Sequence, residues 1–507
     1  AKHLKNVVNN KICPTCKGQR LNSKILSSKI MSKNISDFTQ MTIKENLEFL
    51  NKLEDPTAKY IIDPLKKQLE ALEYIGLSYL TLNRVTTTLS GGEAQRLKLI
   101  RHLNSSLSDL VYIIDEPSVG LHPEDIAKIN EILKSLKEKG NTVLIVEHDP
   151  DVIKEGDYII DMGPGSGKNG GEITFEGTYN ELLSSNTSTG NALRNKHNLK
   201  ENIREANHFY NIGPVTQNNL NNVKTSIPKH VLTVLTGVAG SGKSTLVKAG
   251  FENNDHTIFI DQKAVQGSNR SNLLTYLGVF DSVRSYFSKE TGLNKAMFSY
   301  NSKGACPNCG GKGYIKTELA FMGDFSQTCE VCHGKRYKQE VLDATIDGYS
   351  IADVLNLTVD EGIIFFDKKN DIKSKLQSVS KTGLNYMSLG QPLSTLSGGE
   401  IQRVKLAQHL DEEIKNSIFI FDEPTTGLHE SDIPILMECF DDLIDQNNTV
   451  ILIEHNLSIM CEADWIIDVG PGPGLDGGKV QFSGTPKNFI DSSETLTSKH
   501  LKRYIKQ

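Results

Sequence analysis

One stretch in the middle of the chain has the residue types and spacing of a phosphate-binding loop. GVAGSGKST runs from Gly237 to Thr245, after the apolar run VLTVL and before the helical pattern TLVKAG. In a strand–loop–helix arrangement of this kind, backbone N–H groups curl around the phosphates, a lysine supplies positive charge and a serine hydroxyl joins the magnesium shell. The sequence therefore predicts an ATP and Mg²⁺ site with the ligands Gly237, Gly240, Ser241, Gly242, Lys243, Ser244 and Thr245.

Two carboxylates and a histidine follow apolar runs further along the chain and have the chemistry of an ATPase. Asp422 and Glu423 end the strand-like IFIFDEP, where Asp422 fits the magnesium side and Glu423 fits a group that polarises the attacking water. A capped strand end would explain two acids, but not their place behind a hydrophobic strand next to a phosphate loop. His455 follows VILIE and is a candidate contact of the terminal phosphate, and Gln262 in IDQ is a candidate sensor of metal or water. We predict Lys243, Glu423 and His455 as catalytic residues.

Three motifs occur twice, in the same order. LSGGEAQRLKL at Leu89 returns as LSGGEIQRVKL at Leu396, YIIDEPSVGLH at Tyr112 returns as FIFDEPTTGLH, and NTVLIVEHD at Asn141 returns as NTVILIEHN. Each return is offset by 307 residues, as from Leu89 to Leu396. The chain therefore holds two copies of one module, which we call the front copy and the rear copy. The front equivalents of the rear acids and histidine are Asp115, Glu116 and His148.

The phosphate loop has no front equivalent in the sequence. At the common offset, the equivalent of Lys243 would fall before residue 1, and the first residue is Ala1 instead of Met. We expect the sequence to be the C-terminal part of a longer protein. The alternative is a natural ATPase with a single phosphate loop.

A second glycine-rich patch, GPGSGKNGG, looks at first like another phosphate loop with Lys168 as its lysine. Its rear equivalent, GPGPGLDGG, has leucine in place of Lys168. Lys168 is also followed by Asn169, where a nucleotide site needs Ser or Thr for magnesium. We interpret the patch as a turn before a closing hairpin.

Four cysteines have the spacing of a structural metal site. Cys306, Cys309, Cys329 and Cys332 read C-x2-C-x19-C-x2-C, which is typical of tetrahedral zinc. The predicted zinc module lies between the phosphate loop and the second LSGGE.

The other four cysteines give weaker signals. CPTCKGQRL, with Cys13 and Cys16, parallels CEVCHGKRY in the zinc module, so these two are half of a metal site whose other ligands would lie upstream. Cys439 and Cys461 lie in apolar or helical surroundings, and we expect them to be packing residues.

Composition limits the kind of protein. The 507 residues carry a formal net charge of −6, and 37% are hydrophobic and 23% charged, as is usual for a soluble globular protein. No apolar run is long enough to cross a bilayer and no secretory signal is visible, so the cytoplasm is the expected location. The net negative charge argues against uniform coating of nucleic acid, so any such binding is local.

Two segments are candidates for local binding to DNA. Residues 1–36 contain eight Lys and Arg residues and no Asp or Glu, and residues 303–340 have a mild basic excess on the zinc module. Phosphate contacts from such segments bind a duplex without reading its sequence. We hypothesise that Lys335, Arg336 and residues 1–36 touch the DNA backbone; a solvated basic surface is the alternative.

The repeated LSGGE, the strand ending in DEP and the EH pair resemble the signature, Walker B and histidine-loop motifs of the ATP-binding cassette (ABC) family. That family closes two half-sites head to tail. The resemblance implies that Lys243, Ser244, Asp422, Glu423 and His455 meet Ser90, Gly91 and Gly92 across one ATP. It implies a second half-site formed by Asp115, Glu116 and His148 with Ser397, Gly398 and Gly399.

Nearly the whole chain resembles the UvrA family, through the zinc module placed before LSGGE and through RSNLLTYLGVFDSVRSYF, CEVCHGKRY, SIADVLNLTVDE, LSGGEIQRVKLAQHL, FDEPTTGLH and ADWIIDVGPGPGLDGG. The resemblance implies a homodimeric, DNA-binding ATPase that recognises damaged double-stranded DNA in nucleotide excision repair and loads UvrB. The protein would be part of an excinuclease system without being the nuclease.

Several stretches depart from the pattern usual in that family. FSYNSKGACPNC and AFMGDFSQTC differ from it, and Ala239 replaces a common serine in the phosphate loop. These variants look more like UvrA paralogues, some of which give resistance to DNA-targeting drugs, and they put the UvrB partnership in doubt. A transporter ATPase subunit is a further alternative, although transporter cassettes do not normally carry four cysteines before the signature.

The predicted fold is α/β: tandem P-loop modules of the ABC type, each with a mixed sheet wrapped by helices, with inserted helical signature domains and a zinc module. The expected domains are signature domain I (1–95), ATP-binding module I (96–204), the phosphate-loop part of module II (205–275), signature domain II (276–400) with the zinc module (306–332), and the remainder of module II (401–507).

Overall fold

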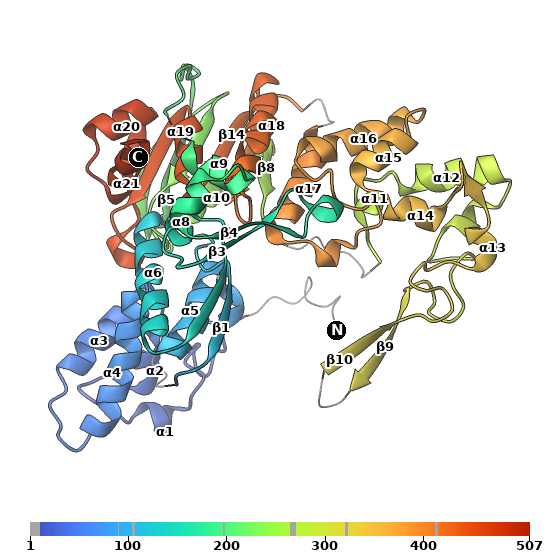
Figure 1. The fold of residues 1–507 in the computed structure, drawn as a ribbon. Helices are drawn as coiled ribbons and strands as arrows, with labels where there is room; N and C mark the ends of the chain where they lie inside the picture. The colour runs from blue at the N-terminus through green and yellow to red at the C-terminus, as the bar shows by residue number, and fades with distance from the viewer. Residues whose placement is uncertain are drawn as a thin grey trace.

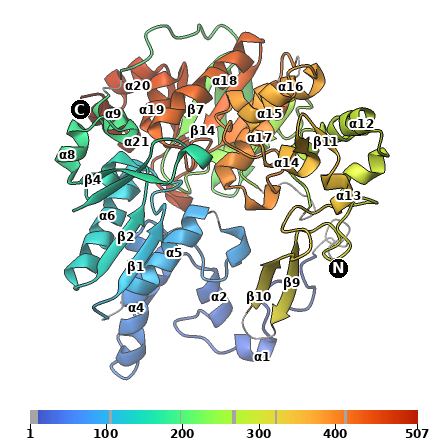
Figure 2. The ribbon, with the colours of Figure 1, turned by 45° about the vertical axis from the view of Figure 1, so that its right-hand side comes forward.

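The structure is a computed structural model that describes residues 11–89, 91–103, 107–195, 198–263, 270–319, 323–410 and 414–506. The front copy, blue to green in Figure 1, lies below the rear module, which is drawn mainly in red. The rear signature domain extends to the other side of the molecule in yellow and orange, and its β9–β10 hairpin (Tyr314–Leu319 and Gly323–Thr328) projects away from the body (Figures 1 and 2).

The front copy begins with a helical domain and continues into a partial α/β module. A buried cluster joins the two, because Ile43, Leu47 and Leu69 of the helical part pack in one core with Ile126 and Ile129 of the module. Its elements are α1 (Ser23–Leu26), α2 (Ile35–Gln40), α3 (Ile43–Asn51), α4 (Lys59–Tyr74), α5 (Gly91–Leu103), β1 (Val111–Asp115), α6 (Pro123–Glu138), β2 (Thr142–Val146), α7 (Pro150–Ile153), β3 (Ile159–Gly163), β4 (Glu172–Gly177), α8 (Tyr179–Ser184) and α9 (Ser188–Arg194).

The rear module is built on a six-stranded sheet in the order β16-β15-β7-β14-β13-β8. All neighbouring strands are parallel except β15 and β16. Its apolar runs are buried on both faces, as expected for parallel strands covered on two sides. Its elements are β5 (Phe209–Gln217), β6 (Leu220–Pro228), β7 (Leu232–Thr236), α10 (Lys243–Phe251), β8 (Thr257–Ile260), β13 (Ile418–Asp422), α18 (Ile433–Asp445), β14 (Thr449–Ile453), α19 (Leu457–Glu462), β15 (Trp465–Gly470), β16 (Lys479–Gly484), α20 (Pro486–Ser492) and α21 (Leu496–Lys506).

The rear signature domain lies between β8 and β13 and has a core of its own. Leu273, Phe287, Phe298, Val354 and Leu376 are fully buried together in it. Its remaining elements are α11 (Leu273–Tyr276), α12 (Phe280–Thr291), α13 (Gln339–Leu342), β11 (Thr345–Ile346), β12 (Tyr349–Ser350), α14 (Ile351–Asn356), α15 (Val359–Phe365), α16 (Asn370–Lys381) and α17 (Gly398–Leu410).

The sheets of the two copies differ, so the expected mixed sheet in each copy is found only in the rear. There, β7 lies between β14 and β15 and joins all strands into one sheet. In the front, β1 pairs with β2 and β3 with β4, and the two pairs remain separate. The physical reason is that no strand equivalent to β7 occurs among the described front residues.

One face of the front strands is consequently open. In the rear, the hairpin β5–β6 and helix α10 cover this face, and Ile420 is only 2% exposed. Its front equivalent, Ile113, is 75% exposed. The same contrast holds for the neighbouring strands, where Met162 is 65% exposed and its rear equivalent Val469 is fully buried. The described front residues thus form half of an α/β core.

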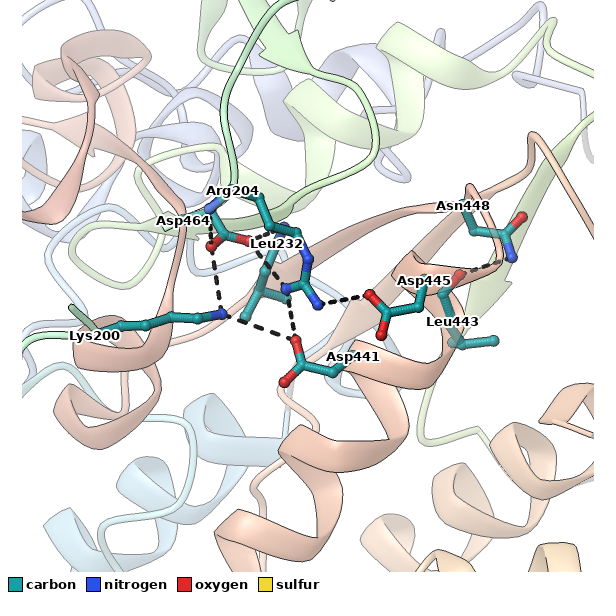
Figure 3. A network of polar contacts seen from close by, with 8 residues as sticks. All are labelled: Lys200, Arg204, Leu232, Asp441, Leu443, Asp445, Asn448 and Asp464. Atoms are coloured by element: carbon teal, nitrogen blue, oxygen red, sulfur yellow. Dashed lines mark hydrogen bonds and ion pairs between the residues drawn. The ribbon is translucent and has the colours of Figure 1, made fainter. Parts of the chain in front are cut away.

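The polar segment before residue 205 is tied to the rear module by the ion-pair network of Figure 3. At its centre, Asp464 is 2% exposed and accepts hydrogen bonds from the backbone N–H groups of Arg204 (3.0 Å) and Leu232 (2.9 Å). The Lys200 ammonium lies 3.3 Å from Asp464. The Arg204 guanidinium reaches Asp441 on α18 at 2.6 Å. The network therefore fixes the chain where it enters the rear module.

We expect Asp464→Asn to destabilise the rear module by about 3 kcal/mol, because Lys200 and Arg204 lose the negative charge that they share and one buried backbone N–H faces an NH2 donor in place of an oxygen. The matched control is Asp157→Asn at the front equivalent, whose side chain is 70% exposed and pairs with Lys137; it should cost below about 0.5 kcal/mol. Urea unfolding followed by the fluorescence of Trp465, the single tryptophan, measures both. Equal effects of the two substitutions would show that the network does not anchor the segment.

Candidate active site

The phosphate-loop segment leaves the end of β7 and leads directly into α10. Gly237 has a φ of 130°, and a Cβ there would lie 2.0 Å from the Val469 carbonyl oxygen, so only glycine fits. Lys243 is 6% exposed, and its Nζ donates to the backbone carbonyls of Gly237 (2.8 Å) and Val238 (3.0 Å). Burial lowers the pKa of Lys243 to about 8, although the Glu423 carboxylate opposes the shift. The loop thus holds a buried cation where phosphate is expected.

A serine hydroxyl and a carboxylate come together beside this loop. The Ser244 hydroxyl donates to Asp422 Oδ1 at 3.4 Å, and the ammonium of Lys248 lies 3.4 Å from Asp422 Oδ2. Magnesium takes oxygen ligands at about 2.1 Å in an octahedron, which places neighbouring ligands about 3 Å apart. Ser244 and Asp422 therefore fit a magnesium ion between them after a small adjustment.

Glu423 follows the end of β13 in a left-handed backbone conformation, with a φ of 53°. Its N–H donates to the Ile453 carbonyl at 2.9 Å, which fixes the turn against β14. Burial, together with the neighbouring Asp422 carboxylate, raises the pKa of Glu423 to about 7. The front copy closes over this side chain, because a Cβ on Gly120 would lie 2.8 Å from Glu423 Oε2. This position suits a general base shielded from bulk water.

His455 is 6% exposed and lies in the same buried region. Burial, with Lys243 nearby, holds its pKa well below the usual value, so the ring is neutral at physiological pH. Its Nδ1 has no hydrogen-bond partner among the described residues. An unpartnered buried nitrogen in this place is available to a ligand or an ordered water.

Sequence reasoning missed the glutamate before each histidine. Glu454 accepts hydrogen bonds from the backbone N–H groups of His455 (2.6 Å) and Thr425 (3.0 Å). Glu147 repeats this in the front copy, with the N–H groups of His148 (2.7 Å) and Ser118 (2.8 Å). Each glutamate ties the histidine loop to the loop after the DEP motif. The repeated EH pair was the signal that could have identified it.

Gln262 connects two parts of the rear copy. Its Nε2 donates to the Glu423 carbonyl (3.0 Å) and to the Thr426 hydroxyl (2.9 Å). Its Oε1 faces the rear signature, where a Cβ on Gly398 would lie 3.1 Å away. Gln262 is therefore placed beside the catalytic turn, as the prediction of a sensing role requires.

The equivalent front residues have different surroundings. Asp115 ends β1, and Glu116 has a φ of 46° and donates its N–H to Val146 (2.9 Å), as Glu423 does in the rear. His148 Nε2 lies 3.5 Å from Glu116 Oε1, and this hydrogen bond raises the pKa of His148. His148 is thus a partly exposed, more basic histidine, in contrast to the buried neutral His455.

The two signatures start helices in the same way. In the rear, the Ser397 hydroxyl accepts from the Glu400 N–H at 3.2 Å, and α17 follows from Gly398. A Cβ on Gly399 would lie 2.4 Å from the Thr426 carbonyl oxygen, which shows how closely the loops approach. In the front, α5 begins at Gly91, and a Cβ on Gly92 would meet the Val119 carbonyl oxygen at 3.0 Å. Ser90 lies outside the described residues.

The loops after the DEP motifs cross between the copies in a reciprocal way. Gly120 of the front lies against Glu423, and Gly427 of the rear lies against Glu116, where a Cβ would be 3.4 Å from Oε1. The next histidines cross too: the His122 ring lies 6.1 Å from that of His455, and the His429 ring 6.3 Å from that of His148. A cavity at this junction is lined by both copies. Each copy thus supplies one wall of the other's site.

The GPGSGKNGG patch also lies at the junction of the copies. It forms a short turn at Gly167–Asn169 between β3 and β4, which pair as antiparallel strands, so the patch is the turn of a hairpin instead of a turn before one. Lys168 Nζ pairs with Glu361 of the rear signature domain at 3.0 Å. The lysine is therefore engaged in a contact between the copies.

The four predicted zinc ligands converge. Cys306, Cys309, Cys329 and Cys332 are buried, and all four sulfurs lie within 4.8 Å of one another. The Sγ atoms of Cys309 and Cys332 are 3.7 Å apart, close to the separation of about 3.8 Å in a tetrahedron with Zn–S bonds of about 2.3 Å. The Gly313 N–H donates to Cys309 Sγ at 3.2 Å, as expected of a zinc knuckle. The cluster has the ligands and the geometry of a metal site, and these fit zinc.

The remaining cysteines lie elsewhere. Cys439 and Cys461 are 2% and 1% exposed in the core of the rear module, which confirms them as packing residues. Cys13 is exposed and Cys16 is partly exposed, and neither belongs to the metal cluster.

Comparison with known proteins agrees with this geometry. The sequence pattern of the ABC transporter family matches residues 220–426, from the phosphate-loop region to the rear carboxylates. The fold and the site define a pair of P-loop ATPase modules of the ABC class. The chain is 43% identical to UvrABC system protein A of Clostridium perfringens over 97% of its length and 40% identical to that of Bacillus subtilis over 99%. The protein belongs to the UvrA family.

A solved structure extends the likeness to the fold. The crystal structure of UvrA2 from Deinococcus radiodurans matches 97% of this chain and 66% of that chain, with a TM-score of 0.91 and 37% sequence identity. The chain spans 57% of the length of each of the two curated relatives. Within the described part of the chain, none of the helices combines the length and apolar character needed to cross a membrane.

We expect the purified chain to carry one zinc ion bound by the four clustered cysteines, which metal analysis after unfolding will count. Cys309→Ser with Cys329→Ser should reduce the zinc content to near zero, because two thiolates do not complete a tetrahedral site. Cys13→Ala with Cys16→Ala is the matched control and should keep the zinc. Loss of zinc in the control, or retention in the first variant, would refute the assignment.

Proposed function

We propose that this protein hydrolyses ATP at a composite site made by the rear phosphate loop and the front signature. The observation that best supports this proposal is that a loop of the front copy covers the rear site, where Gly120 lies against Glu423. In the proposed mechanism, Lys243 and the loop N–H groups hold the phosphates, and Ser244 and Asp422 hold Mg²⁺. Gly91 and Gly92, with Ser90, face the terminal phosphate from the helix N-terminus of α5.

Glu423 and His455 are the proposed groups at the reacting end. Glu423 accepts the proton of the attacking water, and its raised pKa, about 7, keeps it a competent base at neutral pH. Neutral His455 orients the water or the terminal phosphate through a ring nitrogen. Gln262 contacts both the turn at Glu423 and the rear signature, so in this proposal a change in the metal or the water shifts Gln262 and, through it, the signature.

The front half of the pair has a different role in this proposal. Asp115, Glu116 and His148 face Ser397, Gly398 and Gly399 of the rear signature and would form a second nucleotide site. A phosphate loop for that site is not found among the described residues. The proposal therefore uses the phosphate loop of the rear copy, which lies among the described residues.

The proposed substrate context is damaged double-stranded DNA in nucleotide excision repair, with a homodimer that loads a UvrB-like protein. The family supports this, since the relatives are named components of the UvrABC system. ATP and DNA occur together in the bacterial cytoplasm, which is the location we propose. A paralogue that protects against DNA-targeting drugs is the second candidate, favoured by the departures around Cys306 and Cys329. Rescue of a repair-deficient strain supports the first function, and rescue from such drugs alone supports the second.

Lys243→Ala should reduce ATP hydrolysis by at least about 100-fold, because the buried cation at the phosphates is removed. The matched control is Lys168→Ala, at the glycine-rich patch that resembles a phosphate loop; it should retain wild-type turnover. Phosphate release from the purified chain, with and without intact or lesion-bearing duplex, measures both. Turnover that survives in Lys243→Ala would contradict the proposed site.

For DNA we propose that the zinc module contacts the backbone. Lys335 and Lys338 are exposed, and Lys335 lies 3.7 Å from Asp353. Arg336 is partly buried, with its guanidinium over the Tyr300 ring at 5.4 Å. Lys335 therefore remains a candidate contact, whereas Arg336 is also part of the packing of the module. Residues 11–36 of the basic N-terminal segment are described, and residues 1–10 lie outside the described residues.

Lys335→Glu with Lys338→Glu should weaken duplex binding and reduce the slope of log K against log salt by about 1 for each DNA phosphate that the variant no longer neutralises. Zinc content should stay unchanged. Lys59→Glu with Lys67→Glu, on α4 of the front signature domain, makes the same charge change away from the zinc module and should have little effect. A salt slope that is equal in both variants would show that the module does not touch DNA.

A further inference from the structure

Tyr79, between α4 and α5 of the front copy, rests directly on the rear phosphate loop. A Cβ built on Gly240 would lie 2.8 Å from Tyr79 Cζ, so the phenol ring covers the middle of the loop. A Cβ on Gly474 would lie 2.6 Å from the Cβ of Tyr79. At both rear positions a side chain larger than that of glycine would clash with Tyr79.

The two glycines that carry Tyr79 belong to loops that are bonded to each other. The Gly474 N–H donates to the Gly240 carbonyl at 3.0 Å, and the Gly478 N–H donates to the Ser241 carbonyl at 2.9 Å. Lys44 of α3 adds an ion pair with Asp476 of the same loop at 2.9 Å. The surface that Tyr79 contacts is thus hydrogen-bonded to the phosphate loop.

At its other end, Tyr79 holds the front signature. Its hydroxyl donates to Glu93 Oε1 at 2.6 Å, a short bond to a carboxylate that is 6% exposed. Glu93 is the glutamate of the front LSGGE and lies in the first turn of α5, directly after Gly91 and Gly92. One side chain therefore connects the start of the front signature helix with the rear phosphate loop.

The repeat contains a second tyrosine in the equivalent position. Tyr386, at the common offset from Tyr79, donates to Glu400 Oε1 of the rear LSGGE at 2.8 Å. It also rests on Gly167, where a Cβ would lie 3.0 Å from the Cβ of Tyr386. Tyr386 thus repeats the contacts with the signature and the glycine-rich turn, and among the described residues the contact with a phosphate loop is made by Tyr79.

We infer that Tyr79 is a positioning residue for ATP binding, which sets the distance between the front signature and the rear phosphate loop. The inference rests on the proposed composite ATP site. Without the Tyr79–Glu93 bond, the signature helix loses its anchor on the loop, and the closed arrangement becomes less populated. Apparent ATP affinity falls with that population, whereas the reacting groups Lys243, Glu423 and His455 are unchanged.

The test compares Tyr79→Phe, which keeps the ring but removes the bond to Glu93, with Tyr386→Phe, which makes the same change at a tyrosine that has no phosphate loop beside it among the described residues. Tyr79→Phe should raise the KM for ATP and the Kd for a nonhydrolysable Mg-ATP analogue about tenfold, with kcat changed less than about threefold. Tyr386→Phe should change each value less than about twofold. In a Glu93→Ala background, Tyr79→Phe should add little, since either change removes the same hydrogen bond.

Each outcome has a separate meaning. Equal KM values for Tyr79→Phe, Tyr386→Phe and the wild type would overturn the inference, as would additive effects of Tyr79→Phe and Glu93→Ala. Lys243→Ala, measured in parallel, tests the underlying site. If its turnover equals that of the wild type, the proposed function itself is wrong, and the role of Tyr79 falls with it. Tyr79→Phe carries the test even if a Tyr79→Ala variant does not fold.

Discussion

The structure depends on the reciprocal closure of the two copies over each other's carboxylates. Gly120 of the front copy lies against Glu423 and Gly427 of the rear copy lies against Glu116, so neither site is formed by one copy alone. Closure also sets the electrostatics of the rear site. Burial raises the pKa of Glu423 and lowers the pKa of Lys243, and the two groups oppose each other's shifts. The packing of the two copies thus brings the pKa values of Glu423 and Lys243 close to neutral pH.

The closure is symmetric in its contacts but not in its chemistry. Both copies repeat the buried glutamate before the histidine and the loop that crosses to the other copy. Among the described residues, β7, α10 and the β5–β6 hairpin complete and cover the rear sheet, whereas the equivalent face of the front strands is exposed. The buried His455 and the more exposed, glutamate-paired His148 reflect the same difference.

Much of this could be predicted from the sequence, because the signals were local or repeated. The phosphate loop, the four cysteines and the strand ends each have fixed spacing, and the repeat argued against Lys168 as a nucleotide ligand. Contacts between the copies were harder to predict. Tyr79 belongs to none of the repeated motifs that the sequence shows, and its role depends on which residues lie opposite it after folding. The open face of the front strands was also missed, because exposure depends on neighbours that a strand pattern does not contain.

The central claim is that one ATP is held between the rear phosphate loop and the front signature. An experimental structure of the chain with Mg²⁺ and a nonhydrolysable ATP analogue tests it most directly. The account predicts that the terminal phosphate contacts Lys243 from one side and the N–H groups of Gly91 and Gly92 from the other. A nucleotide bound to the rear loop with the front signature outside hydrogen-bonding distance would contradict it.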